Sequence, residues 1–263
     1  MKIKFLLSKL LVSLLIFVYT SMEAKIIESD TLDVILKKAR VGDLVVFDID
    51  NTISNPKSDL GSSEWFDKEV KRLLAQGKDF NDIAAKLEMI HEHVELEVIS
   101  KSNEIIKKLQ DRGIYVMALT SRSLPIANRT IEQMTGLGIN FLINSLYVFD
   151  LDLYVHYPAK YSHGIVFGAN NEKGEILINF LSIVEKLYPE RVASINRVIF
   201  VDDRPKHVTS MANTFNNKAY NKNNLEFLGI KFNYKRATPF SLENAKRELC
   251  TLVNKLGFYP LGI

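Results

Sequence analysis

The sequence predicts an α/β fold in three layers, with a mostly parallel sheet between two layers of helices. Three apolar runs carry this prediction: Leu44 to Phe47, Ile114 to Leu119 and Val198 to Val201. Each run is continuous rather than alternating, which is typical of strands that are buried on both faces of a parallel sheet. Amphipathic helical stretches separate the runs, as the crossover connections of such a sheet require.

Polar side chains follow each predicted strand. Asp48 and Asp50 follow the first run, Thr120 ends the second, and Asp202 and Asp203 follow the third. Because ligands of open parallel sheets bind at the carboxyl ends of the strands, we expect these groups to converge. If strand geometry persists between Asp48 and Asp50, both carboxylates point the same way. Two like charges so close together indicate a divalent cation or a carboxylate with a raised pKa.

Purely structural roles are also open for these residues. Asp48 and Asn51 could cap a turn at the end of a strand, as short polar side chains do. Asp203 precedes Pro205 and suits a helix N-cap. Lys173 begins a predicted helix, where its charge opposes the helix dipole, so its placement indicates another role. Offsetting the carboxylates and a phosphate is such a role.

Taken together, these residues resemble the four motifs of the haloacid dehalogenase (HAD) superfamily. The resemblance rests on the D-x-D-x-T pattern that begins at Asp48, the threonine after the second strand, the lysine at a helix start and the acidic pair. It covers residues 43–208, and its first and fourth motifs are the specific ones. More loosely, the whole chain is similar to a group of secreted bacterial HAD-like proteins that carry only a domain-of-unknown-function label.

This resemblance implies a Rossmann-like fold and a Mg²⁺-dependent phosphatase that hydrolyses a phosphate monoester through an aspartyl-phosphate. It implies Asp48 as the nucleophile and Asp50 as general acid and base. The implied metal ligands are Asp48, the backbone carbonyl of Asp50, and Asp202, with Asp203 as the alternative.

The resemblance also implies that Thr120, Ser121 and Lys173 bind the phosphate oxygens. Arg122 fits equally well as a phosphate-binding guanidinium or as a surface residue at the start of the next helix. The expected partner is a small phosphorylated molecule. A rival hypothesis is a catalytically inactive HAD-like scaffold that binds a partner in the envelope, although all four motif positions are filled. Another rival is a metal-dependent nucleic-acid or nucleotide enzyme on the same fold.

By analogy with the superfamily, residues 55–96 are expected to form a small helical cap inserted between the first and second motifs. Two helical stretches, Ser63 to Ala75 and Phe80 to Ile99, make up most of it. Trp65 and Phe66 are favoured as core residues of this cap.

The remaining chain alternates between helical and extended patterns. Residues 141–168 could form a hairpin that lines the pocket or a surface excursion. Cys250 is expected to be a small buried hydrophobe. The remaining predicted helices are Lys101–Arg112, Asn128–Thr135, Lys173–Leu187, one from Pro205 to about Phe215, and Leu242–Leu256, and the remaining strands are Gly164–Phe167 and Phe227–Tyr234.

Residues 1–24 are expected to be a signal peptide, with lysines before an apolar run and cleavage after Ala24; an uncleaved anchor is the alternative. They hold three of the 34 basic residues and one of the 31 acidic ones, which leaves a mature charge of about +1. This near-neutral charge speaks against a nucleic-acid polymer as partner. The single cysteine allows no intrachain disulfide, which favours the periplasm of a Gram-negative bacterium, with membrane contact only through the signal peptide.

Overall fold

The computed structural model describes residues 23–257, so the predicted signal segment lies outside the described residues except for its last two positions. An eight-stranded sheet forms the centre, in the order β1-β10-β9-β2-β5-β8-β7-β6. Its strands are β1 Lys25–Ser29, β2 Asp43–Phe47, β5 Tyr115–Thr120, β6 Leu151–Tyr154, β7 Pro158–Ser162, β8 Ile165–Phe167, β9 Arg197–Asp202 and β10 Glu226–Phe232.

In the order of the sheet, each strand from β1 through β10, β9, β2 and β5 to β8 is parallel to its neighbours. Strands β7 and β6 then add an antiparallel edge. The predicted fold class, a three-layer Rossmann-like α/β domain with a mostly parallel sheet, is confirmed. The segment 141–168, which the sequence left open, supplies this antiparallel edge: β6 and β7 form a hairpin that pairs through β7 with β8.

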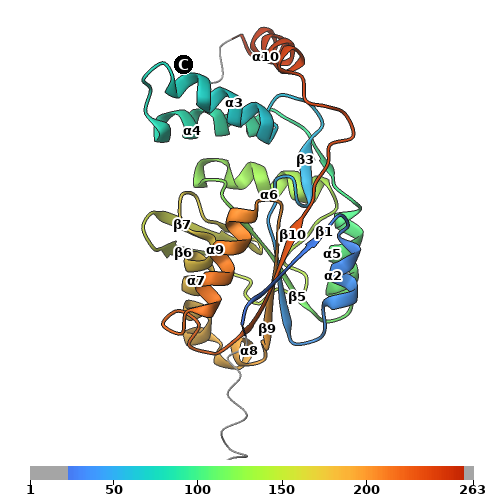
Figure 1. The fold of residues 1–263 in the computed structure, drawn as a ribbon, viewed down its shortest axis with the longest axis vertical. Coiled ribbons are helices and arrows are strands. Elements are labelled where there is room, and N and C mark those ends of the chain that lie inside the picture. Colours follow the sequence, from blue (N-terminus) through green and yellow to red (C-terminus); the bar gives the residue numbers. More distant parts are fainter. Residues whose placement is uncertain (1–22, 258–263) are drawn as a thin grey trace, which may run out of the picture.

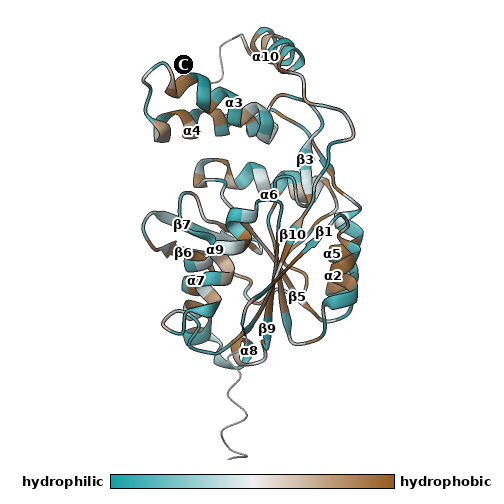
Figure 2. Cartoon of the chain, in the orientation of Figure 1, coloured by the Kyte–Doolittle hydropathy of each residue, from teal (hydrophilic) through white to brown (hydrophobic). Residues whose placement is uncertain are grey.

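Strand β2 shows why the fold has three layers. Its residues alternate between two cores: Val45 and Phe47 pack in one cluster, Leu44 and Val46 in the other. Helices α2, α5 and α6 cover the first face, and α7, α8 and α9 cover the second (Figure 1). Figure 2 shows hydrophobic residues along the central strands, where both faces are covered. These helices are α2 Asp33–Lys38, α5 Ser102–Asp111, α6 Ala127–Gly136, α7 Lys173–Leu187, α8 Pro189–Ala193 and α9 Pro205–Asn216.

Between β2 and α5 the chain leaves the sheet and builds a small helical unit. This unit contains α3 Ser63–Leu74, α4 Phe80–Glu88 and the short 3₁₀ helix η2 Met89–Glu92, on a two-stranded base of β3 Ser54–Pro56 and β4 Leu96–Val98. A second 3₁₀ helix, η3 Leu124–Ile126, precedes α6. In α3, the Ser62 hydroxyl caps the helix by accepting from the Trp65 amide at 3.2 Å. Trp65 is buried as expected, whereas Phe66 is half-buried and faces a cavity.

The predicted helix from Phe80 to Ile99 is wrong in its second half. The α-helix ends at Glu88, and residues 96–98 pair with β3 instead. Pairing with a strand some 40 residues earlier satisfies backbone groups that a helix would otherwise use. No local pattern signals such a long-range partner.

After β10, the chain crosses to the helical unit, where α10 Leu242–Leu256 is the last helix among the described residues. Three contacts fix this crossing. Arg236 pairs with Asp59 at 3.0 Å, Glu248 accepts from the backbone N–H of Leu60 at 2.8 Å, and Tyr234 accepts from the side-chain amide of Asn55. In Figure 1, α10 lies at the same end of the molecule as α3 and α4. The prediction that Cys250 is buried is wrong, because α10 packs only one side on the protein and leaves this residue exposed.

Candidate active site

Three adjacent strands bring the predicted site residues to one edge of the sheet. In the order β9, β2 and β5, these strands end at or just before Asp202, Asp48 and Thr120. All three side chains are buried. The residues lie far apart in the sequence, so it is the parallel topology that brings their side chains to one edge of the sheet.

Lys173 lies between the carboxylates of the first and fourth motifs. Its Nζ donates to Asp48 Oδ1 at 2.5 Å and to Asp202 Oδ2 at 2.7 Å. Lys173 is 4% exposed although it begins helix α7. The two carboxylates offset both its burial and its unfavourable position at the helix N-terminus.

The buried charges shift one another's pKa values. Burial raises the pKa of Asp48 well above its usual range; Lys173 opposes the shift, and Asp202 adds to it. For Asp202, burial also acts to raise the pKa, but the charge of Lys173 and a hydrogen bond from His207 lower it below its ordinary value. The pKa of Lys173 is raised, because the two carboxylates outweigh its burial. A charged lysine held by two acidic groups is the result.

The chemistry of the donor set fits a hard divalent cation. Asp48, Asp202 and Asp203 each offer a carboxylate oxygen, and these atoms lie within 4.8 Å of one another. Lys173 supplies one positive charge against three carboxylates. Burial and the neighbouring Asp202 raise the pKa of Asp203 to about 6, although the charges of Arg204 and Lys173 act to lower it. The buried Oδ1 of Asn51, whose amide donates to Asp203 at 3.3 Å, has no hydrogen-bond partner among residues 23–257.

Asp50 turns its carboxylate away from this cluster and toward Arg122. The guanidinium binds both oxygens, with Nη2 to Oδ1 at 2.7 Å and Nε to Oδ2 at 3.0 Å. Burial raises the pKa of Asp50, but the charge and hydrogen bonds of Arg122 outweigh it and bring the pKa to about 2. Arg122 Nη1 also donates to Thr130 and Gln133, and the side chain is only 3% exposed. Of the two readings left open for Arg122, the surface residue is therefore wrong.

The two remaining phosphate-binding candidates lie at the end of β5. The Thr120 hydroxyl accepts from the Arg122 backbone N–H at 3.1 Å, which leaves its own hydrogen available as a donor. Ser121 is exposed and lines the cavity. Thr52, the last residue of the D-x-D-x-T pattern, directs its hydroxyl to Asp48 Oδ2 at 3.4 Å and accepts from the Asp203 backbone N–H at 3.2 Å.

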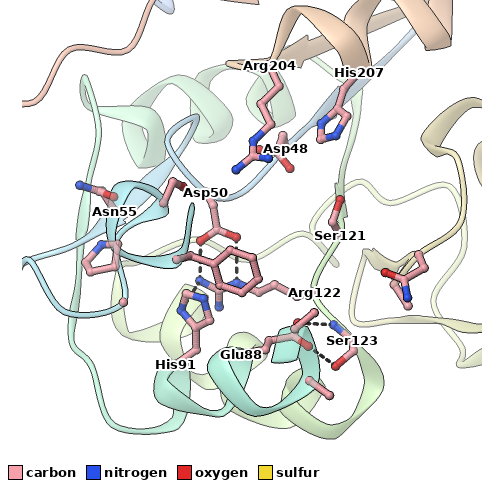
Figure 3. Close-up of a pocket in the computed structure, with 18 of the residues that line it drawn as sticks. Asp48, Asp50, Asn55, Glu88, His91, Ser121, Arg122, Ser123, Arg204 and His207 are labelled. Carbon is pink, nitrogen blue, oxygen red and sulfur yellow. Dashed lines mark hydrogen bonds and ion pairs between the residues drawn. The ribbon is translucent and has the colours of Figure 1, made fainter. Parts of the chain in front are cut away.

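A cavity of about 300 Å³ joins these groups to the helical unit. The view in Figure 3 places Arg204 and His207 near Asp48, and Glu88 and His91 on the opposite side. All four side chains line the cavity. Within this cavity, His207 Nδ1 lies 3.0 Å from Asp202 Oδ2.

Sequence reasoning gave these four residues no role in the site. Each pair has i,i+3 spacing across a helix end: Glu88 ends α4 and His91 lies in η2, while Arg204 is the N-cap residue of α9 and His207 lies in its first turn. That spacing is the signal that could have found them. Burial and the charge of Arg122 lower the pKa of His91 to about 4, so this imidazole is neutral at pH 7.

No helix among residues 23–257 has both the length and the apolar character that crossing a membrane requires.

Fold and site define a three-layer α/β protein with an acidic, lysine-bridged centre at the carboxyl edge of its sheet. Residues 16–256 match the family described as "Protein of unknown function (DUF2608)", so the chain belongs to that family. It is 23% identical over 202 residues to a protein named "Putative outer membrane protein" of Chlamydia trachomatis serovar D, covering 74% of this chain and 70% of the relative. It is 28% identical over 193 residues to an uncharacterized protein of Rickettsia prowazekii, covering 68% of this chain and 67% of that protein.

Among solved structures, the chain is similar to two structures of phosphoserine phosphatase. One, a phospho-aspartyl intermediate analogue, has 17% identity and a TM-score of 0.35, covering 80% of this chain and 97% of that one. The other, an apo form, has 16% identity and a TM-score of 0.34, covering 79% and 97%.

Proposed function

We propose that this protein is a Mg²⁺-dependent phosphatase of the HAD type, which hydrolyses the phosphate monoester of a small molecule. One observation carries the proposal: Asp48, Lys173 and Asp202 are in contact at the end of the central strands, beside a cavity of about 300 Å³. Phosphate monoesters repel nucleophiles and react very slowly without help, so catalysis requires neutralised charge and exact positioning. A carboxylate nucleophile held by a buried cation supplies both.

In the first step, an oxygen of Asp48 attacks phosphorus, and the bond from phosphorus to the leaving-group oxygen breaks. Lys173 holds Asp48 in position through its hydrogen bond to Oδ1. Its positive charge offsets the negative charge on the Asp48 carboxylate and on the phosphate that this carboxylate attacks. In this proposal, Thr120, Ser121 and Arg204 donate to the transferring oxygens. Bound Mg²⁺, held by Asp48, Asp202 and either the Asp50 carbonyl or Asp203, would neutralise charge on the transferring phosphoryl group.

In the second step, water attacks the aspartyl-phosphate, inorganic phosphate leaves and Asp48 is regenerated as a carboxylate. Asp50 accepts the proton of that water. Its pairing with Arg122 keeps the carboxylate charged at neutral pH, so it can accept a proton, but a pKa of about 2 makes it a weak base. The same pairing weakens the role of acid that the superfamily resemblance implied. Departure of the leaving group then depends mainly on the acidity of that group.

We expect Mg²⁺ removal and loss of Asp202 to have the same effect. Asp202→Ala takes one carboxylate from a cation with few protein ligands, so turnover at limiting Mg²⁺ should fall by on the order of 100-fold. Phosphate release with and without EDTA measures turnover, and calorimetric titration with Mg²⁺ measures binding. Asp203→Ala is the matched comparison, with a smaller expected loss; the reverse ranking would assign the ligand to Asp203. Full activity of Asp202→Ala in EDTA would contradict the metal site, and a folded wild type with no turnover would favour the inactive binding scaffold.

We also propose that the protein is exported to the periplasm of a Gram-negative bacterium. Lysines followed by an apolar run within residues 1–24 support this, as do chlamydial relatives that are named for the outer membrane. Cell fractionation with mass spectrometry of the N-terminus should find a form that begins at Lys25 in an envelope fraction. Finding the full-length chain in the cytoplasm, with no processed form elsewhere, would contradict export.

A further inference from the structure

The cavity has an apolar wall on the side of the helical unit. Phe66 on α3 and Phe80, Ala84 and Ala85 on α4 line it. Phe80 and Ala84 are four residues apart and share one face of the helix. Phe80 is 47% exposed, so much of this large ring contacts no protein atoms and is available to a ligand. The alanines beside it leave room that larger side chains would fill.

The charged groups on this side of the cavity disfavour a second anionic group on the ligand. Glu88 keeps a carboxylate there, with both oxygens accepting from the backbone N–H and hydroxyl of Ser123. The Arg122 guanidinium is already bound to Asp50 (Figure 3). A carboxylate or second phosphate would face Glu88 without a free cation from Arg122.

We propose that the substrate is a phosphate monoester whose leaving group has an uncharged, apolar body of about one aromatic ring, with Phe66 and Phe80 as specificity-determining residues. The ring would lie against the two phenylalanines. This inference rests on the proposed function for the place of the phosphate beside Asp48. A volume of about 300 Å³ accommodates such a molecule and is at the small end for ligand pockets.

Phosphonates test the wall without turnover, because their carbon–phosphorus bond is not a phosphate ester. By calorimetry with Mg²⁺ present, benzylphosphonate should bind the purified protein at least about tenfold more tightly than methylphosphonate, since only the former buries a ring. Phe80→Ala should remove most of this preference. Leu74→Ala is the matched control, because Leu74 is a 44% exposed apolar residue of α3 that is not among those lining the cavity. Three outcomes would contradict a ring-binding role for this apolar wall. They are equal affinities for the two phosphonates, an unchanged preference in both Phe66→Ala and Phe80→Ala, and no binding of either phosphonate.

Turnover separates this inference from the proposed function. Hydrolysis of monoesters without a preference for a ring would contradict only the proposed substrate class. Ring-selective binding with no hydrolysis of any monoester would contradict only the proposed phosphatase activity.

Discussion

Asp48→Asn should lower turnover by on the order of 10³-fold or more while the protein stays folded. The amide keeps the shape of the side chain and its acceptor for Lys173, but it cannot attack phosphorus. Removing this charge also relieves its repulsion with Asp202, which acts to raise the pKa of Asp48. The free energy of unfolding should therefore change little. Steady-state phosphate release and chemical denaturation measure the two effects.

A second buried aspartate on the same strand gives the control. Asp43 lies at the start of β2, is 4% exposed and pairs with Arg197 at 2.6 Å, far along the strand from Asp48. Asp43→Asn should cost about 2–3 kcal/mol of stability by weakening that pair, with turnover per folded molecule kept. Retained turnover in Asp48→Asn would contradict the nucleophile. Equal loss in both variants would indicate damage to β2 rather than to chemistry.

The central strands could be predicted because their signal is local. A run such as Leu44 to Phe47 has no polar face, so burial on both sides follows from the residues alone. Once three such strands are parallel neighbours, the residues that follow them must meet at one edge. This explains why Asp48, Thr120 and Asp202 could be grouped without coordinates.

Other elements depend on partners that are distant in the sequence. Strand β1 gains its place by pairing with β10, about 200 residues away, and its exposed positions give no apolar run. Sequence reasoning passed over it and over the short helix α2. Strands β3 and β4 have three residues each and exist through their mutual pairing.

The pair of Arg122 and Asp50 could not be predicted for a related reason. The sequence places Arg122 in a loop after a strand, where solvent and phosphate are equally available. Its burial depends on Thr130 and Gln133 of α6, which accept from its Nη1 and hold the guanidinium against Asp50. Only the packing of α6 against the sheet edge decides between the alternatives. This pair matters most for the chemistry assigned to Asp50.

Asp50→Asn should separate the two steps of the reaction, because a base is needed only in the second. With p-nitrophenyl phosphate the leaving group requires little protonation, so Asp48 can still take the phosphoryl group. Water attack on the aspartyl-phosphate then lacks its base. Quenched flow should show a burst approaching one equivalent of p-nitrophenol followed by slow turnover, with mass spectrometry locating the phosphoryl group on Asp48. An alkyl phosphate should react slowly in both the wild type and the variant.

The structure adds a cost to this variant, because Asp50→Asn leaves the buried Arg122 guanidinium without its carboxylate. Loss of one partner of a buried pair destabilises by roughly 3 kcal/mol, so the burst is measured below the unfolding transition. The double variant Asp50→Asn with Arg122→Gln removes the unpaired charge, keeps hydrogen-bonding groups at both positions and should show the same burst with stability partly restored. A wild type that hydrolyses alkyl and aryl phosphates equally well would restore the role of acid to Asp50. Equal rate losses for both substrates in both variants, with no trapped intermediate, would exclude Asp50 as the base that releases phosphate from Asp48.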